Sequence, residues 1–255
     1  MAAREEGKYL YGIIEARGGL NLGPVGLGGQ EVAVIAYRDL GAVISNAPPG
    51  TCAIAKENLL AHERVLERVM EEHAVLPVRF GTVAANAEEI RWILERGYRE
   101  LKRLLRDMDG KVELGVKALW RDMDRIFREV AEENEEIRRL RAGIAGRPSR
   151  LTHVQRIAIG QMVQAALEAK KEREGEELLR DLRRLAVDHR VHRTIGDRML
   201  LNAVFLVDRD REGEFDDLME RMERRHRERM KFVYVGPAPP YNFVDLALSP
   251  RERAR

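Results

Sequence analysis

Histidines and carboxylates are the residues of this chain that could hold a metal or transfer protons, but their spacing completes no catalytic or metal-binding set. His62 and His73 would share one helix about three turns apart, which is too far to chelate one ion. His189 and His192 would lie on opposite faces of a strand. The carboxylates are interleaved with arginines along helical stretches, which is typical of solvated helix faces. We therefore expect no catalytic residue, no metal, no cofactor and no enzymatic activity.

The single cysteine, Cys52, lies beside Thr51 at the expected start of a helix, where the helix dipole would favour a thiolate. No partner base is visible near it, so the sequence does not favour a reactive role. A lone cysteine also cannot form an intrachain disulfide, which predicts a reducing, cytoplasmic compartment.

A glycine-rich stretch at residues 18–29 has the composition of a phosphate-binding loop. Such a loop must lead into a helix, because the helix N-terminus binds the phosphate groups. Here a strand is expected to follow at Glu31–Tyr37, and the chain has no Gly-Lys-Ser or Gly-Lys-Thr run. We interpret residues 18–29 as a flexible hairpin connection.

Composition excludes two further classes of function. The 255 residues are 35% charged, but 45 Lys and Arg nearly balance 43 Asp and Glu, and a net charge of +2 argues against a dedicated nucleic-acid binder. No segment reaches the roughly 18–20 consecutive apolar residues that a membrane helix needs. The first six residues include acids where a signal peptide has a cationic start. We expect neither a nucleic acid nor a lipid membrane as partner.

Hydrophobic periodicity predicts a first domain over residues 1–120 with a ferredoxin-like antiparallel sheet. Both faces of Glu31–Tyr37 are apolar, which predicts a central strand that is covered on both sides. Two helices, Thr51–His73 and Asn86–Arg106, are expected to cover one face of the sheet. The remaining expected strands are Lys8–Glu15, Ala42–Ser45, Val75–Val83 and Val112–Leu119.

The second domain, residues 121–255, is expected to begin with a helical hairpin and to end with a small antiparallel sheet in a ferredoxin-like α+β unit, so that the whole chain is an α+β protein of two domains. Gly175 could kink the second helix of the hairpin. The expected elements are helices at Arg121–Arg141, Leu151–Leu185 and Glu214–Arg229 and strands at Met199–Asp208 and Lys231–Val235.

Several segments together resemble the gas vesicle protein F/L family in order and spacing. The most specific are the run Leu-Pro-Val-Arg-Phe-Gly-Thr at residues 76–82 and the run Gly-Pro-Ala-Pro-Pro-Tyr at residues 236–241, where Ala238 stands in place of the family's usual tryptophan. The other matching segments are residues 9–13, 112–120 and 199–207.

The resemblance implies a non-catalytic accessory protein that binds the small hydrophobic shell protein of gas vesicles, and possibly other accessory proteins, and that supports vesicle assembly. We predict partner binding, through the first domain, at Tyr9, Tyr11, Arg79 and Phe80. Arg79 alternates away from Phe80 along the expected strand, so it would lie on the other face. A structural salt bridge from Arg79 to a helix glutamate is the alternative.

A competing hypothesis is an RNA- or ligand-binding regulatory module built on a ferredoxin-like sheet. In that case the aromatic residues Tyr9, Tyr11, Phe232 and Tyr234 would stack on bases. The basic-glycine-aromatic signature of RNA-recognition domains is absent, so sheet packing is the favoured role of these residues.

Overall fold

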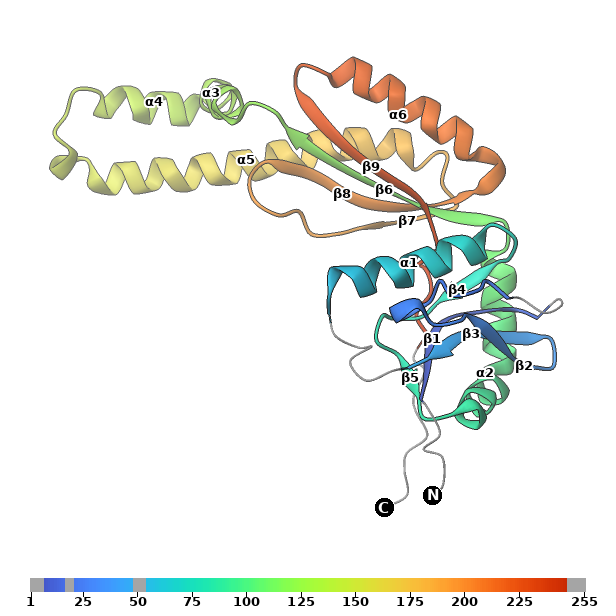
Figure 1. The fold of residues 1–255 in the computed structure, drawn as a ribbon. Helices are drawn as coiled ribbons and strands as arrows, with labels where there is room; N and C mark the ends of the chain where they lie inside the picture. Colours follow the sequence, from blue (N-terminus) through green and yellow to red (C-terminus); the bar gives the residue numbers. More distant parts are fainter. Residues whose placement is uncertain (1–6, 17–20, 48–53, 247–255) are drawn as a thin grey trace. The chain divides into compact units, whose positions relative to one another are not determined.

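The computed structural model describes residues 7–16, 21–47 and 54–246 and shows an α+β fold with two β-sheets. This confirms the predicted fold class. The chain divides into two compact units, which we describe separately (Figure 1). Unit 1 comprises Met1–Glu113 and Pro237–Arg255, and unit 2 comprises Leu114–Gly236. The boundaries fall inside strands, because the chain leaves unit 1 along one strand and returns to it along another.

The sheet of unit 1 has the strand order β2-β3-β1-β4, and β5 pairs with the beginning of β1. All of its pairings are antiparallel, and a register shift between Leu10 and Gly12 marks a bulge in β1. The strands are β1 (Lys8–Glu15), β2 (Ala33–Tyr37), β3 (Leu40–Asn46), β4 (Val75–Pro77) and β5 (Val83–Ala84).

The second strand occupies a different place from the predicted one. β2 lies at the edge of the sheet and is partly exposed, whereas β1 and β3 lie at its centre and are almost entirely buried. The two apolar faces of β2 indicated burial on both sides, but periodicity reports only the character of a face. It does not identify the neighbouring strands, which long-range pairing decides.

Helices α1 (Lys56–Met70) and α2 (Ala87–Met108) cover opposite faces of this sheet, so the prediction that they share one face was wrong. The side chains of α1 pack with Tyr11 and other residues of one face. On the other face, the Tyr37 hydroxyl donates to Glu95 of α2 at 3.0 Å, and Glu15 forms an ion pair with Lys102 of α2. Two helix-covered faces explain why β1 and β3 are apolar on both sides.

The described part of the glycine-rich connection has a defined conformation. Gly23 bridges to Val32, and Leu27–Gly29 forms the short helix η1. Leu27 is 1% exposed and belongs to the core on the α1 side of the sheet. The other part of this connection, residues 17–20, lies outside the described residues, as does Cys52.

The sheet of unit 2 has the order β7-β8-β6-β9. It corrects a prediction, because the strand expected at Val112–Leu119 was assigned to the first sheet but lies here as β6. A long strand with buried residues on both faces fits either sheet by pattern alone. The strands are β6 (Lys111–Trp120), β7 (Asp188–Val191), β8 (Met199–Asp208) and β9 (Met230–Ala238), and α6 (Glu212–His226) connects β8 to β9.

A helical hairpin extends from this sheet, as predicted (Figure 1). One arm is α3 (Met123–Glu133) and α4 (Glu135–Ile144), separated at Asn134, whose side chain accepts hydrogen bonds from the first amides of α4. The other arm is α5 (His153–Leu182), which packs against α3, α4 and β8. The helix continues through Gly175. A Cβ atom at Gly175 would lie 2.6 Å from the Leu200 carbonyl oxygen, so this glycine permits close helix–sheet packing.

Candidate functional site

Two of the predicted partner-binding residues, Tyr9 and Tyr11, lie at the centre of the unit 1 core. Both side chains are 0% exposed, and their ring centroids are 4.9 Å apart. His62 of α1 stacks on Tyr11 with centroids 5.5 Å apart and an interplanar angle of 28°. A partner therefore cannot touch either tyrosine directly in this conformation.

The hydroxyl groups of these tyrosines anchor two loops from inside the core. The amide of Gly81 donates to the Tyr9 hydroxyl oxygen at 3.0 Å, and the amide of Leu27 donates to the Tyr11 hydroxyl oxygen at 2.8 Å. The Tyr11 hydroxyl also lies 2.9 Å from Ser45 Oγ. Buried polar atoms need such partners. The tyrosines thus fix the turn that contains Gly81 and the glycine-rich connection that contains Leu27.

The other two predicted residues, Arg79 and Phe80, lie in that first turn, at the surface. The turn closes through Thr82, whose Oγ1 donates to the Arg79 carbonyl at 2.7 Å, and Gly81 has a φ of 87°. The Phe80 ring is half-buried and contacts the rings of Tyr9 and His62, with centroids 6.1 and 5.8 Å apart. Arg79 is exposed and makes no ion pair within the described parts of the chain. The alternative role of Arg79, a structural salt bridge, therefore has no support here.

Helix α1 adds apolar side chains beside this turn. Leu59 and Leu60 are 38% and 45% exposed, although they belong to a helix whose inner face is buried. Leu59 lies one turn before His62, whose ring contacts Phe80, so Leu59 is on the side of α1 nearer this turn, whereas Leu60 lies on the outer, exposed side of the helix. We call Leu59, Leu60, Arg79 and Phe80 the α1 rim.

Residues near the C-terminus complete the core beneath the α1 rim. Tyr241 packs against the cluster that contains Tyr9 and Tyr11, and burial raises the pKa of its phenol. The next residue is held by Glu113, which is 6% exposed: the backbone amide and the side-chain amide of Asn242 donate to its two carboxylate oxygens at 2.8 and 2.6 Å. The run at residues 236–241 pointed to this segment, but nothing in the sequence pointed to Glu113.

His62 is a strongly perturbed titratable group of this core. Its Nδ1 lies 3.0 Å from the Tyr9 hydroxyl, and its Nε2 has no hydrogen-bond partner among the described residues. Burial in the apolar cluster lowers the pKa of His62 to about 4, and a contact with the backbone of Val78 only partly opposes this effect. The imidazole is therefore neutral near pH 7. The sequence indicated a core or interface histidine, and the structure places it in the core.

Comparison with known proteins assigns this architecture to a family. Residues 7–245 match the family described as gas vesicle synthesis protein GvpL/GvpF. The chain belongs to this family.

Individual relatives agree over nearly their whole lengths. Gas vesicle protein F1 of Halobacterium salinarum is 28% identical over 252 residues, which cover 97% of each chain. Gas vesicle protein F of a Streptomyces species is 31% identical, over 93% of this chain and 99% of its own. The crystal structure of GvpF from an Anabaena species has a TM-score of 0.85 at 26% identity and covers 95% of this chain and 100% of its own. These relatives carry the names of gas vesicle proteins rather than of enzymes.

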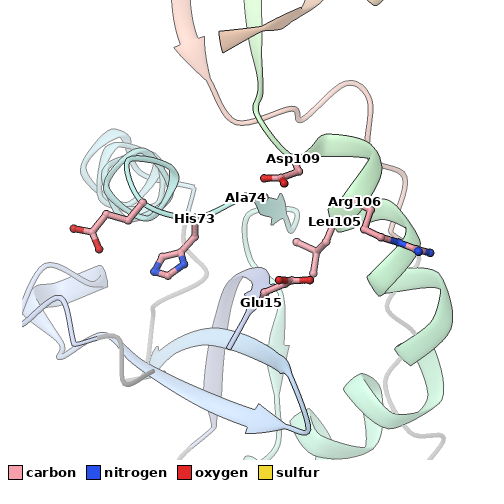
Figure 2. A pocket seen from close by; sticks show the side chains of 7 residues that line it. Glu15, His73, Ala74, Leu105, Arg106 and Asp109 are labelled. Carbon is pink, nitrogen blue, oxygen red and sulfur yellow. The ribbon is translucent and has the colours of Figure 1, made fainter. Parts of the chain in front are cut away.

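Each of the two units contains a cavity. A cavity of about 310 Å³ in unit 1 lies between the residues that follow α1 and the end of α2 (Figure 2). Within the described parts of the chain, no group of three or more His, Cys, Asp or Glu is arranged to hold a metal ion. The residues that line the cavity are Glu15, Glu72, His73, Ala74, Leu105, Arg106 and Asp109.

A larger cavity, of about 580 Å³, lies in unit 2 and is lined by an ionic network. Arg229 donates two hydrogen bonds to Glu129, at 2.9 and 2.7 Å, and two to Glu174, at 3.1 and 2.7 Å. Lys170 is 3% exposed and lies 3.2 Å from Glu129. The Arg229 guanidinium holds the pKa of Glu129 at about 2. These charges neutralise one another, so the network ties α3, α5 and the start of β9 together.

In the part of the chain that the structure describes, no helix is both long enough and apolar enough to cross a membrane.

Proposed function

We propose that this protein binds the small hydrophobic shell subunit of gas vesicles through the α1 rim and supports vesicle assembly in the cytoplasm. Membership of the gas vesicle family supports a role with gas vesicles, which is the general part of this proposal. The observation that carries it is the α1 rim itself, where Leu59 and Leu60 remain exposed and Arg79 has no ion partner among the described residues.

The physical need for such a partner follows from the shell. A subunit that tiles a gas-filled wall must carry an apolar face before it is assembled, and exposed apolar surface leads to aggregation. Leu59, Leu60 and Phe80 offer apolar area that could cover part of that face. Arg79 adds a charge at the border, which favours one orientation of the bound subunit more than it adds affinity.

The buried tyrosines have an indirect role in this proposal. Tyr9 holds the Gly81 amide, and its ring contacts Phe80, so the turn is supported from below. A preorganised surface loses less conformational entropy when a partner binds. Tyr9 and Tyr11 are therefore positioning residues for the α1 rim rather than contacts.

Capture of purified shell subunit tests the proposal directly. We expect roughly tenfold weaker capture by Leu59→Ser/Leu60→Ser, because two half-exposed apolar side chains are lost, and a smaller loss in Arg79→Ala. The melting temperature of each variant is measured alongside capture. Arg103→Ala, which removes an exposed arginine from α2 on the opposite face of the sheet, is the matched control and should capture normally.

Three outcomes distinguish the possible roles. Reduced capture with an unchanged melting temperature supports a contact at the α1 rim. Loss of both supports a purely structural role for the substituted residue. If the wild-type protein captures no shell subunit and vesicles form normally without it, the proposal is wrong.

The alternative function, RNA or ligand binding on an open sheet, has less support. Tyr9 and Tyr11 are buried beneath α1, where no base could stack on them. On the second sheet, Tyr234 stacks on Phe215 of α6 and its hydroxyl donates to Asp216 at 2.6 Å. A salt-dependent mobility shift with RNA would favour this alternative.

A further inference from the structure

The hairpin of unit 2 contains a cluster of positive charge, although the net charge of the whole chain is close to zero. No Asp or Glu occurs from Ile137 to Leu167, although the chain contains 43 of these acids. The same stretch contains six arginines and no Phe, Tyr or Trp. The arginines are Arg138, Arg139, Arg141, Arg147, Arg150 and Arg156.

The fold brings these arginines to the far end of the hairpin, where α4 ends and α5 begins (Figure 1). All six are exposed. Arg139 forms an ion pair with Glu135 at 3.1 Å, and Arg156 donates to Thr152 Oγ1 at 3.1 Å. The other four make no ion pair with any residue that the structure describes. We call residues 138–157 the hairpin tip.

Apolar side chains are exposed among these charges. Leu151 and Val154 are each 75% exposed, and Ile157 is 50% exposed. Leu151 ends the short 3-10 helix η2 (Ser149–Leu151) just before α5, and Val154 and Ile157 lie three residues apart on one side of the first turns of α5. Thr152, between them in sequence, is 1% exposed, so the helix has an inner face packed in the hairpin and an outer apolar face without a partner in the described chain.

We propose that the hairpin tip docks an acidic α-helix of a protein partner, whose apolar residues cover Leu151, Val154 and Ile157. Charge complementarity is the argument for the acidic character of the partner, because the tip carries arginines and no acid. The apolar row is the argument for a helix, because an amphipathic helix presents apolar residues at the same three- and four-residue spacing.

Two other anionic partners fit the same features less well. A nucleic acid would neutralise the arginines but would leave the apolar row exposed, and the tip offers no Phe, Tyr or Trp ring for stacking on bases. A segment that lies on an anionic membrane usually buries several Trp, Phe or Leu side chains, and of these types the tip has only Leu151 as an exposed side chain. An acidic amphipathic helix satisfies both the charged and the apolar parts of the tip.

This surface is separate from the α1 rim, since the rim belongs to unit 1 and the tip to unit 2. The inference therefore does not rest on shell-protein binding. If both surfaces are used, one molecule holds two different partners.

Fluorescence anisotropy with designed peptides tests the proposal on the full chain. The probe is a labelled Glu/Leu peptide of about 20 residues, long enough to form a helix, with leucine at positions i, i+3, i+4 and i+7. A Glu/Ser peptide lacks the apolar row, and a Lys/Leu peptide reverses the charge. We expect only the Glu/Leu peptide to bind tightly, and its binding to weaken as salt is raised from about 50 mM to 500 mM.

Two sets of variants locate the binding. Arg141→Gln/Arg147→Gln/Arg150→Gln should weaken binding of the Glu/Leu peptide roughly tenfold or more, and Leu151→Ser/Val154→Ser should weaken it comparably. The matched control is Arg91→Gln/Arg99→Gln/Arg103→Gln, which removes three exposed arginines of α2 and should bind normally. All substituted side chains are exposed, so circular dichroism should show unchanged melting.

Several outcomes would overturn the proposal. One is equal binding of the Glu/Leu and Lys/Leu peptides, and another is Glu/Leu binding that neither tip variant weakens. Binding of phosphatidylglycerol vesicles or duplex DNA that the arginine variant abolishes, without peptide binding, would assign the tip to a membrane or a nucleic acid. Self-association in sedimentation that the same variant abolishes would assign it to a second copy of this chain.

Discussion

Acidification should destabilise this protein through His62, and the size of the effect follows from the geometry of the core. The imidazole is 3% exposed and is surrounded by the rings of Tyr9, Tyr11 and Phe80. Among the described residues only its Nδ1 has a side-chain hydrogen-bond partner, at 3.0 Å, so a second proton would place a charge in an apolar cluster. In the unfolded chain the same proton binds in water without this penalty.

The sign and magnitude follow from proton linkage. The pKa of His62 is about 4 in the fold and 6.5 for an ordinary histidine, so the unfolded chain binds the proton more readily. Stability is therefore fully present above pH 6.5 and decreases as the pH falls from 6.5 towards 4. The difference in pKa corresponds to about 3 kcal/mol, of which about 2.5 kcal/mol should be lost by pH 4.5.

Urea denaturation at several pH values between 7.5 and 4.5 measures this effect. Carboxylates such as Glu129 also change stability at low pH, so the informative quantity is the difference between wild type and His62→Gln. Glutamine can still accept a hydrogen bond from Tyr9 but does not titrate. The free energy of unfolding of His62→Gln should fall by about 2.5 kcal/mol less than that of the wild type over this range. His153→Gln, at an exposed position, is the matched control and should behave as wild type.

Equal pH dependence of wild type and His62→Gln would refute this reasoning. It would mean that the core admits water or rearranges, so that the protonated imidazole is solvated in the folded state.

Three substitutions test other features of the fold through urea denaturation. Gly81→Val should cost about 2 kcal/mol because a φ of 87° strains any β-branched residue; Gly143→Ala, in an exposed helix with open space around it, should cost nothing. Gly175→Ala should cost about 2 kcal/mol, because its Cβ would lie 2.6 Å from a backbone oxygen; an unchanged midpoint would show that α5 shifts freely. Arg229→Met should cost about 3 kcal/mol by leaving two glutamates partly buried without their partner, and a neutral result would show that they are hydrated.

Local pattern predicted the elements of this chain better than it predicted their arrangement. The strands at Lys8–Glu15 and Met199–Asp208 have the predicted bounds, because each is a long apolar run with clear ends. The sheet to which β6 belongs could not be predicted from the pattern of its residues. Its partners β8 and β9 lie far away in sequence, and side-chain alternation does not encode which strands pair.

The same difference between local pattern and three-dimensional arrangement applies to the candidate site. The alternation of Val78, Arg79 and Phe80 predicted that Arg79 lies on the opposite face from its two neighbours, and the structure has Val78 buried, Arg79 exposed and Phe80 half-buried. The strand itself ends at Pro77, so these residues form a turn. Sheet packing was one of the two roles predicted for Tyr9, but its complete burial depends on α1, which packs over that face only in the folded chain.

Net charge was the least informative property of the sequence, and the hairpin tip shows why. The net charge of +2 is a sum in which an arginine-rich stretch without acids is offset by acid-rich segments elsewhere, such as the beginning of α6. Electrostatic attraction decays over about 8–10 Å in physiological salt, so a partner responds to the charge of the surface it approaches and not to the sum over the chain. A nearly neutral protein can therefore bind one anionic partner in a strongly salt-dependent way. Near neutrality excludes a chain that is basic throughout, but it does not exclude a local basic docking surface.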